Sequence, residues 1–111
     1  MTQKQDVVCV RVTLKPDSLE TVRAWARFIS NHRDEALNTL QQEGVAIESV
    51  FLETTPEGSS LVYYMRSNSQ EAAEAVAAKS VAAIDEYHKG FKRETWLRVD
   101  RLELPVDLVS P

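Results

Sequence analysis

Hydrophobic positions along the chain follow two periodicities in turn. In residues 7–14 every second position is apolar, a pattern typical of a strand that buries one face. In residues 16–43 apolar positions recur at intervals of three and four, which predicts a helix, and Gly44 is its expected C-terminal stop. The pattern favours one long helix over two shorter helices divided near residues 30–31.

The rest of the chain predicts a hairpin, two helical pieces and a last strand. In chain order, these elements cover about residues 45–53, 61–65, 68–79, 81–91 and 96–104. Pro56 and Gly58 separate the first two of them, so we expect a turn between paired strands. Asn68 and Glu71 have the spacing of a capping-box variant, which would begin the alanine-rich helix. The order of elements is therefore β-α-β-β-α-β.

This order predicts an α+β fold of the ferredoxin-like type, with a four-stranded antiparallel sheet and its helices on one face. We expect one domain over residues 1–111, with residues 105–111 as a loose C-terminal tail. Both faces of the second strand are apolar. Val45, Ile47 and Phe51 are expected on one face, and Ala46, Val50 and Leu52 on the other. Since the helices can cover only one face, the pattern predicts a homodimer joined through the other sheet face.

Composition argues against several partners. The chain has 111 residues, a formal net charge of −4 and 27% charged residues. Its basic residues are scattered, so no basic stripe is available to neutralise the phosphates of a nucleic acid. No stretch approaches the roughly 20 apolar residues that span a membrane, and residues 1–6 lack the apolar core of a signal peptide. We therefore expect a cytoplasmic protein that binds neither nucleic acid nor membrane.

The sequence carries no motif for a bound metal or cofactor. Its single cysteine, Cys9, can form no internal disulfide, and the apolar run around it favours an inert buried thiol. No spacing of cysteine and histidine matches a zinc site, and no glycine-rich loop is present to hold a phosphate. We expect neither a metal nor a cofactor.

The chain resembles the dimeric α/β-barrel superfamily in its element order and its two apolar sheet faces. Four stretches further resemble a small bacterial domain family of unknown function. They are Arg33-Asp34-Glu35-Ala36-Leu37 with Glu43-Gly44-Val45, Glu48-Ser49-Val50-Phe51-Leu52-Glu53, Tyr63-Tyr64-Met65, and Ile84-Asp85-x-x-His88. The wider superfamily includes cofactor-free monooxygenases, isomerases, haem enzymes and inert stress-related members. The resemblance therefore implies a fold and a range of activities, and it assigns no catalytic residue.

His88 is the strongest candidate for proton transfer. On the predicted helix Ile84, His88 and Phe91 share one face, which we expect to point inward. Asp85 precedes His88 by three residues, close enough on a helix for its carboxylate to orient the imidazole. A histidine held in this way beside apolar groups can act as a general base near neutral pH. The alternative is a structural histidine that bonds to Asp85 for packing.

Three further residues are candidates for binding a substrate. Arg33 interrupts the apolar stripe of the first helix, so we expect it to be at least half buried and paired with Glu48 or Asp85. The functional alternative is an arginine that binds an acidic substrate. Glu48 lies in an apolar strand, and Tyr64 would complete the wall of a pocket. We predict that His88 and Asp85 line the main pocket with at least one of these three residues.

Two functions fit these residues. The first is a cofactor-free enzyme that acts on a small organic molecule in a pocket between helices and sheet, with His88 as the proton-transfer group. The second is a non-catalytic dimer for small-ligand binding or interaction, which uses the same pocket without turnover. The two differ over His88, because catalysis requires access to its imidazole and a structural role does not.

Overall fold

The computed structural model describes residues 5–111 of the chain. In order, its elements are β1 (Asp6–Leu14), α1 (Leu19–Asn31), α2 (Arg33–Glu43), β2 (Val45–Thr55), β3 (Gly58–Ser67), α3 (Gln70–Lys79), α4 (Ala83–Thr95) and β4 (Trp96–Arg101). The order of strands and helical regions is the predicted β-α-β-β-α-β. The fold is α+β and ferredoxin-like, as the sequence pattern predicts.

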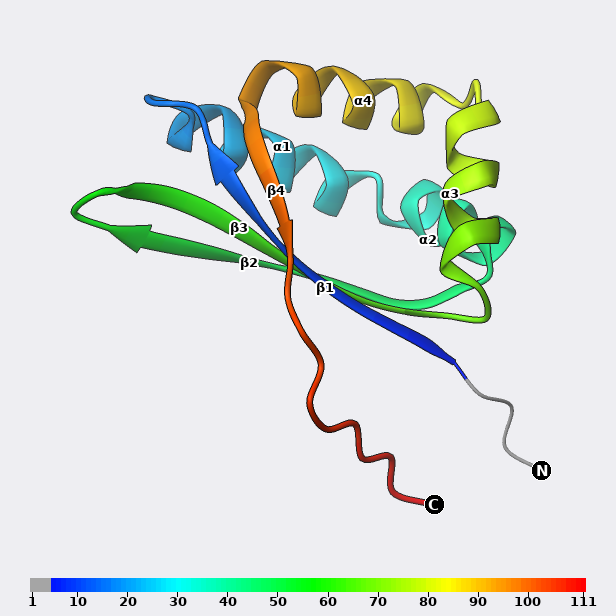
Figure 1. Ribbon diagram of the computed structural model, residues 1–111. Coiled ribbons are helices and arrows are strands. Elements are labelled where there is room, and N and C mark those ends of the chain that lie inside the picture. Colours follow the sequence, from blue (N-terminus) through cyan, green and yellow to red (C-terminus); the bar gives the residue numbers. More distant parts are fainter. Residues whose placement is uncertain (1–4) are drawn as a thin grey trace.

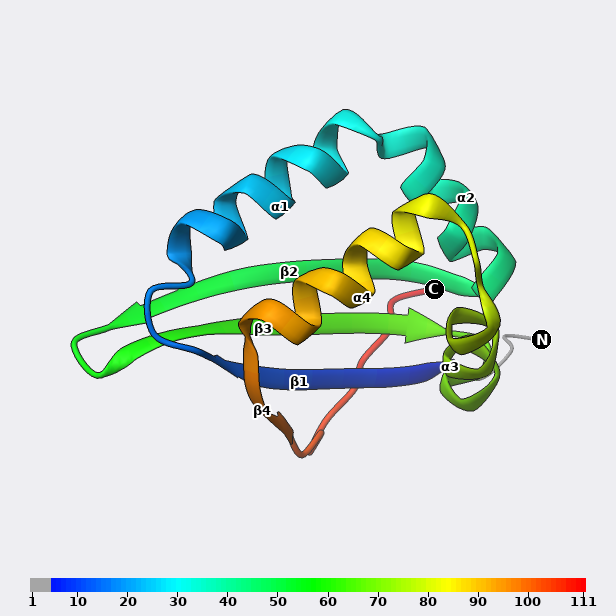
Figure 2. The ribbon, with the colours of Figure 1, turned by 90° about the horizontal axis from the view of Figure 1, so that it is seen from above.

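The four strands form one antiparallel sheet in the order β2-β3-β1-β4. All of the helices lie on one face of this sheet, which we call the helix face (Figure 1). Helices α1 and α4 run side by side across it, as the view from above shows (Figure 2). We call the other face the open face. The segment after β4 passes along the open side of the sheet (Figure 1).

The helical region before β2 is broken, so the prediction of one long helix is wrong. Helix α1 ends at Asn31 and α2 begins at Arg33, with His32 between them at φ −115° and ψ 37°. The His32 Nδ1–H donates to the backbone oxygen of Phe28 over 2.8 Å, which stabilises the end of α1. The break turns α2 down toward the sheet (Figure 1), where it contacts β2. A straight helix of this length would instead extend beyond the sheet edge.

Two local features differ from the predicted ones, namely the start of α3 and the regularity of β2. The N-cap of α3 is Ser69, whose hydroxyl accepts from the Ala72 backbone N–H, so the predicted cap at Asn68 is displaced by one residue. A bulge in β2 shifts the pairing between Val45 and Ile47. Val45 is therefore buried while Ile47 is exposed, although a regular strand would place both on one face.

The core lies between the sheet and the helices α1 and α4. Its buried members are Val12, Leu14, Val22, Trp25, Leu61, Tyr63 and Phe91. The alternation in β1 is confirmed, since Val8 is also buried and the intervening Cys9 is half-buried on the open face. Gly44 ends α2 at φ 74°, a conformation that glycine adopts without strain, which confirms its predicted role as the helix stop.

The segment after β4 stays close to the sheet at two points. Leu102 N–H donates to the Cys9 carbonyl oxygen, and Asp107 forms an ion pair of 2.5 Å with Arg66. Its apolar side chains are nonetheless exposed, namely those of Leu104, Val106, Leu108 and Val109. Strand β4 itself ends at Arg101, three residues earlier than predicted. Within residues 5–111, no helix is long and apolar enough to cross a membrane.

Candidate functional site

Five rings gather beneath α4, and His88 lies among them. Trp25 of α1 stacks on Phe91 of α4 at 4.6 Å between ring centroids. The His88 ring lies 5.7 Å from Trp25, 6.3 Å from Tyr63 of β3 and 6.4 Å from Trp96. His88 and Phe91 share the inward face of α4, as their spacing of three residues predicts. This set of five residues is called the ring cluster below.

His88 is bound by Trp25. The indole Nε1–H of Trp25 donates to Nδ1 of His88 over 3.2 Å. Burial lowers the pKa of His88 to about 4, and the positive charge of nearby Lys92 lowers it further. The imidazole is therefore neutral near pH 7, because its surroundings disfavour the charged form.

Two polar atoms of the ring cluster are buried without a hydrogen-bond partner among residues 5–111. They are the hydroxyl of Tyr63, a residue only 3% exposed, and the indole Nε1–H of Trp96. The two rings are 5.4 Å apart, and the Trp96 N–H lies close enough to the Tyr63 hydroxyl to oppose the rise of its pKa, although the geometry falls short of a full hydrogen bond. Burial raises the pKa of Tyr63, and so does the charge of Glu48. Buried polar groups usually have partners, so these two atoms are candidates for contact with a ligand.

Three carboxylates lie close to one another where α2, α4 and β2 meet, and that of Glu48 also lies near Tyr63 of the ring cluster. Partial burial raises the pKa of Glu43 to about 7, and the charges of Asp85 and Glu48 contribute. Glu48 is exposed in the single chain, yet the protein atoms around its carboxylate raise its pKa as well. Lys92 is their counter-charge, and its Nζ lies 4.8 Å from the Trp96 ring centroid. A carboxyl with a raised pKa can exchange a proton near neutral pH.

Asp85 does not orient His88. Its carboxylate accepts a short hydrogen bond from the Ser80 hydroxyl, just before α4 begins. The group that orients the imidazole is the Trp25 indole, which comes from a different helix. The predicted Asp85–His88 pair is therefore absent among the described residues, and a role of Asp85 in catalysis stays a prediction.

Arg33 is exposed, and within residues 5–111 it forms no ion pair, so the prediction that it is buried and paired is wrong. The cause is the break at His32. Arg33 is the first residue of α2, and the interruption removes it from the apolar stripe that a continuous helix would have had. Helix α2 buries none of its residues. Binding of a substrate by Arg33 stays a prediction.

Tyr64 lies on the open face, away from His88. Its hydroxyl accepts from Nε of Arg66 over 2.5 Å, and Arg66 in turn binds Asp107. The tyrosine beside His88 is Tyr63, because neighbouring residues of a strand point to opposite faces. Of the three predicted substrate-binding residues, Glu48 alone adjoins the ring cluster.

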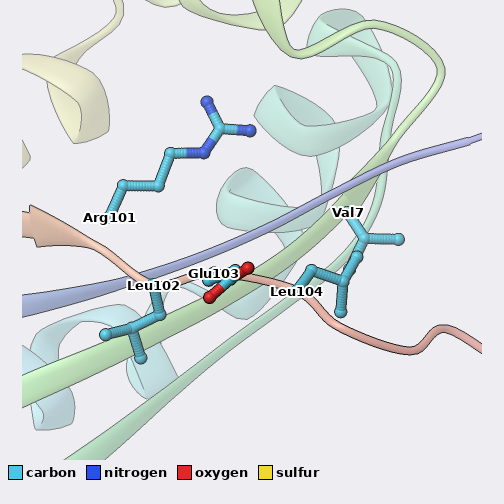
Figure 3. A pocket seen from close by; sticks show the side chains of 5 residues that line it. All are labelled: Val7, Arg101, Leu102, Glu103 and Leu104. Atoms are coloured by element: carbon cyan, nitrogen blue, oxygen red, sulfur yellow. The ribbon is translucent and has the colours of Figure 1, made fainter.

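Among residues 5–111, the two best-formed surface pockets include only one residue of the ring cluster, Phe91. The first, of about 470 Å³, lies between the start of β1 and the segment after β4 (Figure 3). It is lined by Val7, Arg101, Leu102, Glu103 and Leu104. The second lies between α1 and α4 and is lined by Thr21, Glu86, Tyr87, Gly90, Phe91 and Glu94. Neither includes His88 or Asp85, so the prediction that these two residues line the main pocket is wrong.

Sequence reasoning missed four residues of this region. They are Trp25, Tyr63, Lys92 and Trp96. One signal was available in α4, where Asp85, His88 and Lys92 follow at intervals of three and four and therefore share a helix face. Among residues 5–111, no group of three or more histidine, cysteine or carboxylate side chains could hold a metal ion.

Solved structures with this fold resemble the chain at low sequence identity. A protein from Mycobacterium tuberculosis has 21% identity and a TM-score of 0.56, over 96% of this chain and 100% of that one. A protein from Nitrosomonas europaea, provisionally assigned as an antibiotic biosynthesis monooxygenase, has 14% identity and a TM-score of 0.60, over 92% and 89%. A dimeric ferredoxin-like protein from an uncultured marine organism has 8% identity and a TM-score of 0.61, over 95% and 91%.

These likenesses establish the fold alone, a ferredoxin-like α+β fold with a four-stranded antiparallel sheet. No curated protein matches the sequence. A family model does match it over residues 5–110, which is nearly its full length. The chain belongs to this family, a family of unknown function called DUF6176.

Proposed function

We propose that the protein is an enzyme that binds a small organic molecule at the ring cluster and transfers a proton on it with side chains alone. One observation carries this proposal. The Tyr63 hydroxyl and the Trp96 N–H are buried without partners, and His88 adjoins both rings. Polar atoms of a ligand would supply the missing hydrogen bonds, which offset the cost of burying such groups.

Glu48 is the proposed proton-transfer group. Its carboxylate is close enough to Tyr63 to raise the pKa of the phenol, and its own pKa is raised by crowding. A carboxylate whose pKa is raised is a stronger base than an ordinary one, so it can take up a proton from a bound molecule and return it. The three carboxylates outnumber Lys92, so the region favours a neutral or cationic substrate over an acidic one.

Non-catalytic binding of a small ligand is the second candidate. It is favoured by the hydrogen bond from Trp25, which occupies the Nδ1 lone pair of His88. An imidazole engaged in this way is a poor general base at that atom. The fold is compatible with both candidates, since solved proteins with this fold include one provisionally assigned as an antibiotic biosynthesis monooxygenase.

Ligand-detected NMR on a set of small neutral aromatic compounds tests the proposal. Compounds that bind the wild type should lose affinity for the Tyr63→Phe variant, which removes only the unpartnered hydroxyl. The matched control is Tyr64→Phe, since Tyr64 is the next residue and lies on the open face. Spectra followed over hours then separate the two candidates, because an enzyme converts a bound compound and a binding protein does not. Binding that is equal in all three proteins contradicts the proposed site.

We also propose that two copies of the chain pair through the open face. Phe51 and Ile47 are large apolar residues on this face, and they are 59% and 44% exposed in the single chain. The exposed apolar side chains of the segment after β4 adjoin the same side of the molecule (Figure 1). A second copy would cover both sets, which a soluble monomer rarely leaves exposed. Light scattering of the purified chain tests this pairing.

A further inference from the structure

We propose that Trp25 is a positioning residue that fixes His88 in a single neutral tautomer, with its hydrogen on Nε2. His88 then serves the site as a hydrogen-bond donor, in place of the general base that its sequence pattern predicts. The consequence for the ligand class, namely a molecule with an acceptor oxygen, rests on the proposed function. The tautomer itself does not.

The argument starts from the chemistry of the two rings. An indole Nε1–H can only donate a hydrogen bond, so Nδ1 of His88 must accept it with a lone pair. A neutral imidazole has one N–H and one acceptor nitrogen, which leaves the hydrogen on Nε2. Because the bond measures 3.2 Å and joins different helices, it holds both the tautomer and the position of the ring.

The donor is held by packing. Trp25 is only 8% exposed, and its ring stacks on Phe91 with an angle of 6° between the planes. It also contacts Tyr63, at 6.5 Å between centroids. An indole packed on both sides cannot turn its N–H toward solvent without opening the core. The hydrogen bond to His88 is therefore a fixed property of the folded chain.

The charged form of His88 is disfavoured by the same geometry. An imidazolium carries hydrogen on both nitrogens, so its Nδ1–H would face the Trp25 N–H and neither could accept. Lys92 follows His88 by one helical turn on the same helix and adds a like charge. These two effects act with burial to keep the ring neutral.

The neighbours of His88 define the class of ligand. Trp96 Nε1 is a second obligatory donor, and it is buried without an acceptor. The Tyr63 hydroxyl can either donate or accept. Two donors beside one adaptable hydroxyl match a molecule that presents an oxygen with free lone pairs, such as a ketone, ester or amide carbonyl. A ligand whose polar groups only donate would leave both N–H groups unsatisfied.

NMR of the full-length protein with ¹⁵N-labelled histidine tests the role of Trp25. Long-range ¹H–¹⁵N spectra at neutral pH should give the Nε2–H pattern for His88 in the wild type. The Trp25→Phe variant should change this pattern to an averaged mixture of tautomers. The matched control is Trp96→Phe, which removes the other indole near His88 and should leave the pattern unchanged. A wild-type spectrum with hydrogen on Nδ1, or an unchanged pattern in Trp25→Phe, overturns the proposal.

A pair of probes tests the ligand class separately. Acetophenone and ethylbenzene have similar shapes, and only acetophenone carries a carbonyl oxygen. We expect acetophenone to bind about tenfold more tightly, which corresponds to one net hydrogen bond. Equal affinities overturn the preference for an acceptor. If neither probe binds while the tautomer is as expected, the proposed small-molecule site fails and the role of Trp25 stands.

Discussion

Tyr63 and Tyr64 are adjacent in β3, yet their hydroxyls lie on opposite faces of the sheet and differ in hydrogen bonding. The Tyr63 hydroxyl is buried on the helix face without a partner, whereas the Tyr64 hydroxyl accepts from Arg66 on the open face. An unpartnered buried hydroxyl lowers the stability of the folded chain, since water would bind it in the unfolded state. The folded protein therefore retains a group that destabilises it, which is common at binding sites.

We expect Tyr63→Phe to leave the free energy of unfolding unchanged or to raise it by about 1 kcal/mol, because the variant removes the cost of the buried hydroxyl. Tyr64→Phe should lower it by about 0.5–1.5 kcal/mol, through loss of a hydrogen bond. Chemical denaturation of the three proteins measures both effects. A large loss of stability in Tyr63→Phe would mean that its hydroxyl has a structural partner.

His88 should make the protein less stable as the pH falls. Its pKa is about 4 in the folded chain and near the ordinary 6.5 in the unfolded chain, so the unfolded chain binds a proton first on acidification. The contribution is fully present above pH 6.5 and is lost between about 6.5 and 4. It amounts to roughly 3 kcal/mol for a shift of this size. His88→Asn keeps an acceptor for Trp25 and cannot titrate, so its stability should fall less over this range.

The matched variant for His88 is His32→Asn, which replaces the other histidine at the helix break. Denaturation series between about pH 4 and pH 7 compare the three proteins. As the pH falls through this range, His88→Asn should gain stability relative to the wild type and to His32→Asn, because it lacks the unfavourable protonation of His88. Identical slopes in all three would contradict the neutral, buried state of His88.

Glu43 should make the protein less stable as the pH rises, which is the opposite of the effect of His88. Its pKa is about 7 in the folded chain and 4.5 ordinarily, so the folded chain keeps its proton longer as the pH rises. This contribution is present below pH 4.5 and is lost between about 4.5 and 7. The Glu43→Gln variant stays neutral, and we expect it to be more stable than the wild type at about pH 8, where the repulsion by Asp85 and Glu48 is greatest.

Urea denaturation at about pH 8 and pH 4.5 checks the Glu43 prediction, with Glu57→Gln in the turn between β2 and β3 as the control. Glu43→Gln should have a higher free energy of unfolding than the wild type only at the higher pH. Because the effects of His88 and Glu43 have opposite signs between about pH 4.5 and 6.5, the wild-type curve should be nearly flat there. If Glu43→Gln were more stable than the wild type by the same amount at both pH values, the ionisation of Glu43 would not be the cause.

Phe51→Glu should convert the proposed dimer into a folded monomer. The side chain is 59% exposed in the single chain, so a charge there costs little in the monomer and would be buried against a second copy. The control is Val81→Glu, at a residue 88% exposed between α3 and α4. Light scattering at micromolar concentration should give twice 12.5 kDa for the wild type and the control, and 12.5 kDa for Phe51→Glu. A wild-type mass of 12.5 kDa would refute pairing.

The sequence pattern was sufficient for the order of elements and the fold class. Period-two alternation in β1 and the stop at Gly44 are local signals, and both act as predicted. The break at His32 was missed because apolar spacing continues across it. Its cause is a side-chain bond from His32 to the Phe28 carbonyl oxygen, which periodicity does not report. The bulge in β2 is hidden for a similar reason, since pairing register depends on the neighbouring strand.

The candidate site was predicted less well than the fold. His88 was found from its place on the inward face of α4, a relationship within one helix. Its partner Trp25 is 63 residues away in the sequence, so local spacing gave the nearer Asp85 instead. The choice between Tyr63 and Tyr64 likewise depended on which face of β3 the helices cover. Contacts between elements that are distant in the sequence can be identified only once the fold is known.

The break at His32 also divides the helical region into two parts that should open at different free energies. Helix α1 buries Val22 and Trp25, whereas α2 buries none of its residues. Amide hydrogens of α2 should therefore exchange with heavy water through local openings of low free energy. Those of α1 should exchange only through larger unfolding events of higher free energy. Since Glu43 is the last residue of α2, each such opening would bring solvent to the carboxylates beside the ring cluster while α1 keeps Trp25 in place.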